Sequence, residues 1–179
     1  MKVIGIGHRA RQGKDSFARR IVMVAGANGY YAKQYGFADA LRAYCRVAFG
    51  MTSKNATLLQ TVGTEVFRDH VSRSIWSETL RYTIEEEQPD IAIITDVRFP
   101  EEVKLVRQYS GVTVKVQRYT ETNGTSHPFY TADRDPNHRS EIALMDENYW
   151  DYTVANDGDL IDLSDKAKQF FNLEIQRAF

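Results

Sequence analysis

The amino-acid sequence predicts a three-layer α/β fold, in which a mostly parallel sheet of about five strands is flanked by helices on both faces. One observation behind this class is that apolar strand patterns alternate along the chain with segments whose apolar residues recur at helical spacing. The other is residues 91–95, Ile-Ala-Ile-Ile-Thr, which read as a parallel strand covered on both faces. The ligand site of such a fold lies beyond the carboxyl ends of its strands.

The first half of the chain opens with a strand, a loop and a helix. Residues 2–7 are apolar and end in glycine, which predicts the first strand, and apolar side chains recur at helical spacing over 16–25. Residues 31–37 predict a second strand. The helix expected over 38–49 is ended by Gly50, because glycine readily takes up the conformation that closes a helix.

Two helices precede the central strand at 91–95 and another follows it. Apolar residues recur at helical spacing over 59–70 and again over 74–87, where Pro89 ends the pattern. Pro100 opens the next helix, since proline fits a first helical turn.

The last third of the chain adds two strands, a long polar segment and a helix. Residues 112–116 and 152–155 have strand patterns, and an amphipathic helix runs over 163–175. Residues 120–141 are mostly polar and longer than most loops, which predicts a lid that closes over the site. We expect residues 1–179 to form a single domain.

Composition and charge narrow the class of protein. The chain has 179 residues, 42% of them hydrophobic, and its one cysteine, Cys45, excludes a disulfide scaffold. Without an apolar run of about 20 residues, we expect a cytoplasmic protein that does not bind a membrane. The net charge is −1, yet basic residues dominate the first part of the chain, which suggests an anion held near its start.

A phosphate-binding loop is predicted between the first strand and the first helix. Backbone N–H groups at a helix start hold a di- or triphosphate, and Lys14 would reach its β and γ oxygens. The usual first glycine is replaced by His8 and the usual hydroxyl residue by Asp15, so Mg²⁺ would contact either Asp15 or Ser16. A basic glycine turn is the alternative interpretation. The nucleotide-binding candidates are His8, Arg9, Ala10, Arg11, Gln12, Gly13, Lys14, Asp15 and Ser16.

A second set of candidates follows the central strand. Asp96 stands where an acid would face the phosphate loop, either to hold Mg²⁺ or to accept a proton from an acceptor hydroxyl. Arg98 would bridge the donor and acceptor phosphates. The alternative is a plain turn at the end of the strand. With Lys14, these two residues form the predicted catalytic set.

Further polar residues are candidates for the acceptor side. Gln60, Thr64 and Arg68 stand four residues apart and share one helix face. This face either binds the acceptor or forms a solvent-exposed edge of the helix, with Glu65 paired to Arg68. Asp39 and Arg42 point toward the same rim, although Asp39 serves equally as a helix cap. Arg134, Arg139 and Glu141 are lid candidates that would close over phosphates.

Taken together, five blocks of sequence resemble the bacteriophage deoxynucleoside monophosphate kinase family of P-loop kinases. They are 13–16 (GKDS), 37–42 (FADALR), 60–68 (QTVGTEVFR), 96–100 (DVRFP) and 138–141 (HRSE). The resemblance implies transfer of the ATP γ-phosphate to a deoxynucleotide with Mg²⁺. It also implies that Asp39, Arg42, Gln60, Thr64 and Arg68 contact the acceptor and that 134–141 is a lid.

Three functions fit this resemblance. The first is a deoxynucleoside monophosphate kinase, and the second is a related phage kinase that phosphorylates the hydroxymethyl group of 5-hydroxymethyluracil in DNA. The chain is shorter than the larger phage enzymes, and an open acceptor site would suit the second function. The third is a non-catalytic nucleotide-binding module, against which Lys14 and Asp96 argue. A homodimer is one possible assembly.

Overall fold

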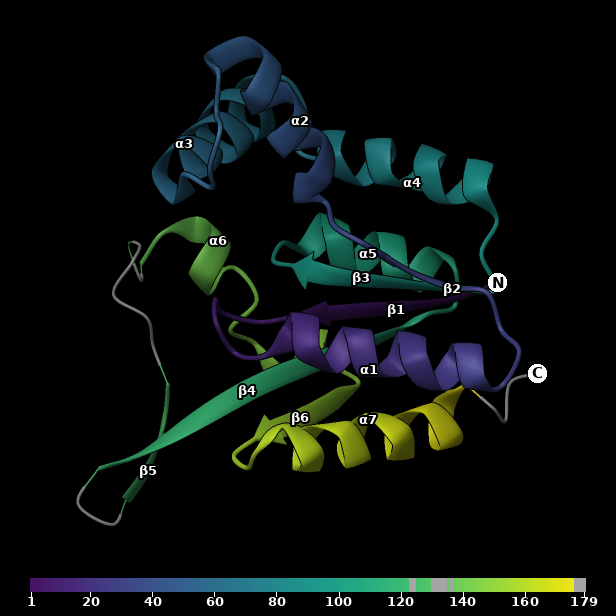
Figure 1. Cartoon of the computed structure of the whole chain (residues 1–179). Coiled ribbons are helices and arrows are strands. Elements are labelled where there is room, and N and C mark those ends of the chain that lie inside the picture. The colour runs from purple at the N-terminus through teal and green to yellow at the C-terminus, as the bar shows by residue number, and fades with distance from the viewer. Residues whose placement is uncertain (123–124, 130–134, 136, 176–179) are drawn as a thin grey trace.

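The computed structural model describes residues 1–122, 125–129, 135 and 137–175. Among them, five parallel strands form the central sheet in the order β2, β3, β1, β4, β6, and β5 pairs antiparallel with the far end of β4 (Figure 1). The strands are β1 (Lys2–Gly7), β2 (Ala32–Tyr35), β3 (Ile91–Val97), β4 (Val112–Thr122), β5 (Thr125–Pro128) and β6 (Tyr152–Asn156). The predicted α/β class is confirmed.

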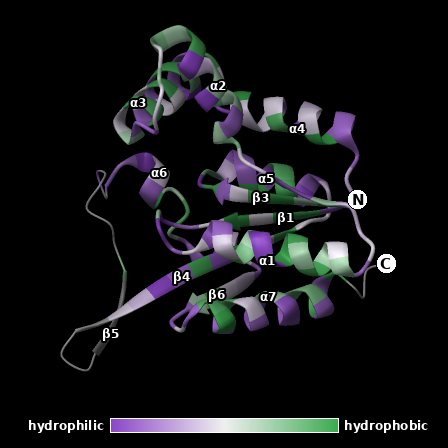
Figure 2. Ribbon diagram, in the orientation of Figure 1, coloured by the Kyte–Doolittle hydropathy of each residue, from purple (hydrophilic) through white to green (hydrophobic). Residues whose placement is uncertain are grey.

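Helices cover both faces of this sheet and form two separate cores. On one face lie α1 (Lys14–Ala27) and α7 (Leu160–Glu174), whose Phe17 and Phe171 are fully buried against the strands. On the other face lie α4 (Ile75–Glu87) and α5 (Pro100–Gln108) (Figure 1). Figure 2 shows the central strand β1 as hydrophobic along most of its length, as its position between the two cores requires.

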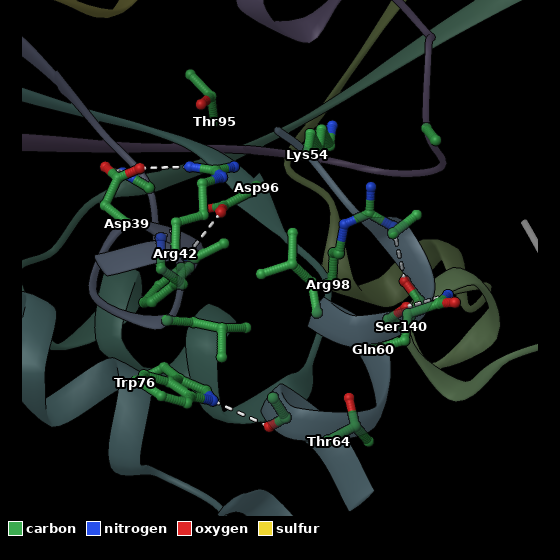
Figure 3. A pocket seen from close by; sticks show the side chains of 18 of the residues that line it. Asp39, Arg42, Lys54, Gln60, Thr64, Trp76, Thr95, Asp96, Arg98 and Ser140 are labelled. Atoms are coloured by element: carbon green, nitrogen blue, oxygen red, sulfur yellow. Dashed lines mark hydrogen bonds and ion pairs between the residues drawn. The ribbon is translucent and has the colours of Figure 1, made fainter. Parts of the chain in front are cut away.

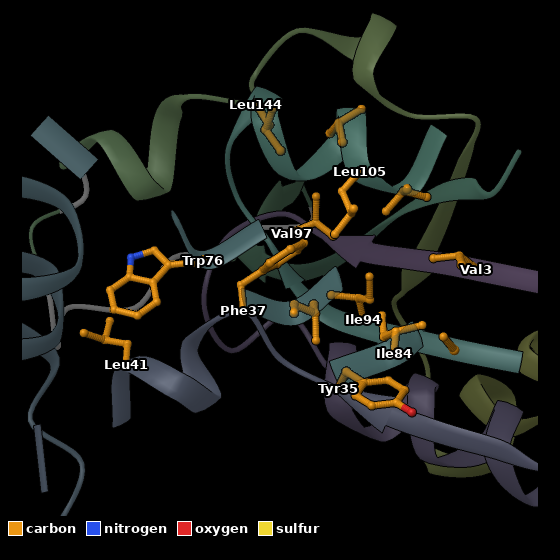
Figure 4. Close-up of a cluster of buried hydrophobic side chains, with 14 of the residues drawn as sticks. Val3, Tyr35, Phe37, Leu41, Trp76, Ile84, Ile94, Val97, Leu105 and Leu144 are labelled. Carbon is orange, nitrogen blue, oxygen red and sulfur yellow. The ribbon is translucent and has the colours of Figure 1, made fainter. Parts of the chain in front are cut away.

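The second core extends beyond the sheet toward a group of short helices. This group contains α2 (Ala38–Phe49), α3 (Ala56–Gln60) and the π-helix η1 (Thr61–Arg68). Trp76 and Leu41 belong to the same hydrophobic core as the strand residues Val97 and Ile94, and connect it to these helices (Figure 4). The group therefore stands over the carboxyl ends of β2 and β3, where the ligand site of this fold is expected.

Most predicted elements are confirmed, with two differences. The helix over 38–49 has the predicted bounds, whereas the pattern over 59–70 corresponds to a short α-helix continued by a π-helix. Apolar periodicity does not separate these two helix types, because both bury one face. Strand β4 extends to Thr122, six residues beyond the predicted end at 116, because β5 and β6 pair with its later part.

The predicted lid is only partly described. Within 120–141 the structure places the end of β4, strand β5 and the short helix α6 (Arg139–Ile142), while Arg134 lies outside the described residues. The lid therefore stays a prediction. Over the residues that are described, no helix is both long enough and apolar enough to cross a membrane.

Candidate active site

The loop between β1 and α1 has the shape of a phosphate-binding loop. Three of its residues have left-handed backbone conformations, with φ of 92° at His8, 57° at Arg11 and 95° at Gly13. A Cβ atom on Gly13 would lie 2.4 Å from Nδ2 of Asn156, the last residue of β6. Asn156 also donates a hydrogen bond to the Gln12 carbonyl at 3.0 Å. Glycine is therefore required at position 13 on two counts, conformation and space.

Lys14 begins helix α1 and is only 7% exposed. Its Nζ donates to the carbonyl of Arg9, which folds the loop back over the ammonium group. Burial, assisted by the charge of Arg98, lowers the pKa of Lys14 from its ordinary 10.5 to about 7. Within the described residues no carboxylate forms an ion pair with this ammonium, so it is well suited to hold an anion.

Two predicted nucleotide-binding residues use their side chains to hold the loop. The Gln12 side chain, 1% exposed, donates to the Phe129 carbonyl at 2.7 Å and accepts from the Arg118 N–H at 2.5 Å. The His8 ring packs edge-on against Trp150, with 6.5 Å between the ring centroids. Burial lowers the pKa of His8 to about 3, so its ring is neutral. These side-chain contacts stabilise the loop.

Beside this loop is a cleft of about 1020 Å³. Its walls come from the loop, the start of α2, the helices α3 and η1, and the end of β3, and Figure 3 shows Asp39 beside Arg42 and Gln60 beside Ser140. The predicted residues that line it are Ala10, Arg11, Lys14, Asp15, Asp39, Arg42, Gln60, Thr64, Arg68, Asp96 and Arg98. The structure thus gathers predicted residues from four segments of the sequence around one cavity.

Two acids, Asp96 and Asp39, lie close to Gly36 in the lining of the cleft. Asp96 accepts hydrogen bonds from the N–H groups of Phe37 (2.7 Å) and Ala38 (2.9 Å), at the start of α2. Asp39 accepts from the Gly36 N–H at 2.9 Å and pairs with Arg42 at 2.5 Å. Burial raises the pKa of Asp96 despite these hydrogen bonds.

The shared face of Gln60, Thr64 and Arg68 is confirmed, since all three line the cleft. The alternative of a solvent-exposed edge is wrong, because Thr64 is 4% and Arg68 6% exposed. Arg68 pairs with the buried Glu102 on α5 instead of Glu65, and its guanidinium lies 4.1 Å from the centre of the Phe99 ring.

The π-helix carries this wall and fits closely against its neighbours. The Gly63 carbonyl accepts from Trp76 Nε1 at 3.0 Å, and a Cβ on Gly63 would lie 2.5 Å from Leu41 Cδ2. A π-helical segment shifts the side chains after it relative to an α-helix, and such segments are frequent at functional sites. Here the π-helix contains both Thr64 and Arg68, and both are buried.

Arg98 and the lid candidates meet at one edge of the cleft. Arg98 Nη1 donates to the Ser140 carbonyl at 3.0 Å and pairs with Glu141 Oε1 at 2.5 Å. Glu141 is 7% exposed and lies behind Arg98, outside the cleft lining. Arg139 also lies outside it, paired with Asp69 at 2.7 Å.

The candidate metal ligands are placed differently from one another. Asp15 and Asp96 line the cleft, whereas Ser16 does not. In the described part of the chain, no group of three or more His, Cys, Asp or Glu side chains is arranged to hold a metal ion. Among the described residues, Asp15 and Asp96 offer carboxylates to a cation without forming a complete metal site.

Several lining residues were not predicted from the sequence. Thr95, at the end of β3, precedes Asp96 and is reached by Gln34 Nε2 at 3.4 Å. Trp76, Leu41 and Lys54 complete the far wall. Thr95 could have been predicted, because it directly precedes Asp96 on a buried strand. Nothing in the local sequence marks Trp76, which reaches the cleft through the packing of α4.

The strand, the left-handed loop and the buried lysine at a helix start define a P-loop kinase fold. Solved structures with this fold are similar over nearly the whole chain. Shikimate kinase from Acinetobacter baumannii matches with a TM-score of 0.52 and 12% identity, covering 99% of this chain and 94% of that one. APS kinase from Mycobacterium tuberculosis matches with a TM-score of 0.50 and 10% identity, covering 96% of each.

The family model for deoxynucleotide monophosphate kinase matches residues 54–167, and the chain belongs to this family. A deoxynucleoside-5'-monophosphate kinase of Escherichia phage T5 is 49% identical over 51 residues, which are 28% of this chain. The matched region spans only one fifth of that relative's length. The phosphate loop precedes residue 54, so its geometry supports the kinase fold independently of the family match.

Proposed function

We propose that this protein transfers the γ-phosphate of ATP to a deoxynucleoside monophosphate, giving the diphosphate and ADP. The observation that carries the proposal is the single cleft that joins the phosphate loop to Asp39, Gln60, Thr64 and Arg68. Small-molecule sites commonly occupy about 300–1000 Å³. At about 1020 Å³ the cleft is large enough for a donor polyphosphate and an acceptor side by side.

The donor would lie on the loop. Backbone N–H groups at the start of α1 and the positive end of its dipole favour the β and γ phosphates. Lys14, buried at this helix start, would contact their oxygens, and Arg11 lines the same part of the cleft. Phosphoryl transfer needs in-line placement and charge stabilisation more than covalent chemistry, and these cations supply the second.

Magnesium fits the residues that line the cleft. Mg²⁺ is usually held by one or two carboxylates together with substrate phosphates and water, and Asp15 and Asp96 offer two carboxylates. When bound, the ion would neutralise charge on the transferred phosphate. Asp96 has both oxygens engaged by backbone N–H groups, which fixes its orientation toward the cleft.

The acceptor would lie against the opposite wall. Its phosphate would approach Arg98 and Arg42, and its base would meet a surface with both apolar and polar groups. Leu41, Leu59 and Trp76 supply apolar contact, and Gln60 and Thr64 supply an amide and a hydroxyl. A few convergent polar groups within an apolar lining are typical of a site that orients a small ligand.

The proposal is tested with labelled ATP, Mg²⁺ and, in separate reactions, each deoxynucleoside monophosphate and a duplex containing 5-hydroxymethyluracil. Label in a free deoxynucleotide is the expected result. Lys14→Ala should reduce transfer by orders of magnitude, while Lys168→Ala, which removes an exposed lysine of α7, should leave the rate unchanged. Label in the duplex alone would assign the acceptor to DNA. Transfer to no acceptor, with ATP still bound, would favour a non-catalytic module.

A further inference from the structure

Glu141 joins two parts of the site although it does not line the cleft. Its Oε2 accepts the backbone N–H of Ala10, in the phosphate loop, at 3.2 Å. Its Oε1 pairs with Arg98 Nη1 at 2.5 Å, beyond the end of β3. The Glu141 side chain is 4% exposed in this pair, and that of Arg98 is 17% exposed. One buried carboxylate therefore fixes the distance between the donor loop and the arginine.

The position of Glu141 is itself well determined. It lies in the short helix α6, where His138 Nδ1 accepts from the Ser140 N–H at 3.2 Å and the Glu141 N–H donates to the His138 carbonyl at 2.7 Å. The Ser140 carbonyl accepts from the same Nη1 of Arg98 at 3.0 Å. Arg98 is thus held by two acceptors on one helical turn.

The remaining nitrogens of Arg98 are left for the cleft. Over the residues the structure describes, Nη1 makes all the hydrogen bonds of the Arg98 side chain, and Arg98 lines the cleft while Glu141 does not. A guanidinium held through one nitrogen presents its other N–H groups in a fixed plane, which matches the geometry of a phosphate.

We propose that Glu141 is a positioning residue for phosphoryl transfer, which orients Arg98 toward the transferred phosphate and sets its distance from the donor loop. The inference rests on the proposed function. Since a misplacement of about 1 Å can cost about 100-fold in rate, loss of this anchor should lower kcat far more than it weakens donor binding.

Glu141→Gln separates the contact of this carboxylate with Ala10 from its contact with Arg98. The amide oxygen can still accept the Ala10 N–H, but the amide nitrogen is a donor and cannot pair with Arg98. We expect kcat to fall about 10- to 100-fold while KM for ATP changes less than about threefold. Glu141→Asp keeps the charge with a shorter side chain and should give an intermediate kcat. Glu86→Gln, at an exposed position of α4, is the matched control and should behave like the wild type.

The Arg98→Ala background decides whether Glu141 acts through Arg98. Adding Glu141→Gln to Arg98→Ala should cause no further loss of kcat, because the group being positioned is already gone. A full additional loss would overturn the inference, as would a kcat of Glu141→Gln within twofold of the wild type.

A measurement without turnover keeps this test separate from the proposed function. In ¹⁵N-arginine spectra, the Arg98 guanidinium should show slow rotation in the wild type and fast rotation in Glu141→Gln, with the Ala10 amide still protected from exchange. Unchanged Arg98 rotation would overturn the inference even in an active enzyme. A wild type that phosphorylates no deoxynucleotide but shows these spectral changes would overturn the proposed function alone.

Discussion

Nucleotide binding should take up a proton at Lys14, because this lysine is only partly charged in the free protein. Lys14 is 7% exposed, and burial lowers its pKa to about 7. A bound polyphosphate brings negative charge to the same place, which favours the charged form and raises the pKa again. The free protein therefore binds fewer protons at this site than the complex does. Nucleotide binding must take up protons from the buffer, and the number taken up increases with pH.

The size of the effect follows from a pKa of about 7. At pH 8 about 9% of the free Lys14 is charged, so binding should take up about 0.9 proton, whereas at pH 6 the uptake should be about 0.1. By linkage, the association constant should fall about tenfold for each pH unit above 7, until the pKa of the complex is reached.

Calorimetry of ADP binding at pH 8, in buffers with different ionisation enthalpies, measures this uptake directly. ADP is fully ionised at this pH, since the second pKa of a phosphate is about 6. Lys14→Met should abolish the uptake, and Lys168→Met should retain it. Uptake below about 0.2 proton in the wild type, or equal uptake in Lys14→Met, would refute a lowered pKa at Lys14.

Three further predictions concern stability. Arg68→Met leaves the carboxylate of Glu102 buried without its charge partner, and should lower the free energy of unfolding in denaturant by about 3–5 kcal/mol. The double variant Arg68→Met/Glu102→Gln should lose less stability than the sum of the two single changes. Gly13→Ala should destabilise by more than about 1 kcal/mol, because φ is 95° and the new Cβ would meet Asn156; a change below about 0.3 kcal/mol would contradict the strained geometry. The pKa of His8 is about 3 in the folded protein, against 6.5 in the unfolded chain. The contribution of neutral His8 to the free energy of unfolding is therefore complete above pH 6.5 and is lost as the pH falls toward 3, at up to about 1.4 kcal/mol per pH unit. His8→Asn should flatten that slope in unfolding measurements between pH 4 and 6.

The parts of the site that could be predicted from sequence are those with local causes. The phosphate loop, the buried strand β3 and helix α2 depend on residues close together in the chain. Pro100 correctly marked a helix start, and Glu102 in the first turn of that helix does more than favour the helix dipole. Its carboxylate accepts the N–H groups of Arg98 (2.6 Å) and Phe99 (3.1 Å) and also pairs with Arg68, 34 residues away. No periodicity reveals a pair between distant segments.

The π-helix could not be predicted from the sequence, for a related reason. Gln60, Thr64 and Arg68 were correctly placed on one face, but their depth depends on Trp76 and Glu102, which come from α4 and α5. An amphipathic pattern predicts which side chains share a face and does not say whether a polar edge of that face meets solvent or another helix. Here the neighbouring helices bury it.

The same reasoning explains why the phosphate loop departs from the usual glycine at His8. A residue other than glycine in a left-handed conformation costs about 1–3 kcal/mol and persists only where its surroundings determine it. His8, with φ 92°, packs against Trp150. The Gln12 side chain is hydrogen-bonded to the backbone of Arg118 and Phe129, and the Ala10 N–H is hydrogen-bonded to Glu141. All these anchors lie between residues 118 and 150, far from the loop in sequence. The conformation of the loop is therefore imposed by distant segments, and a glycine at position 8 is not required to maintain it.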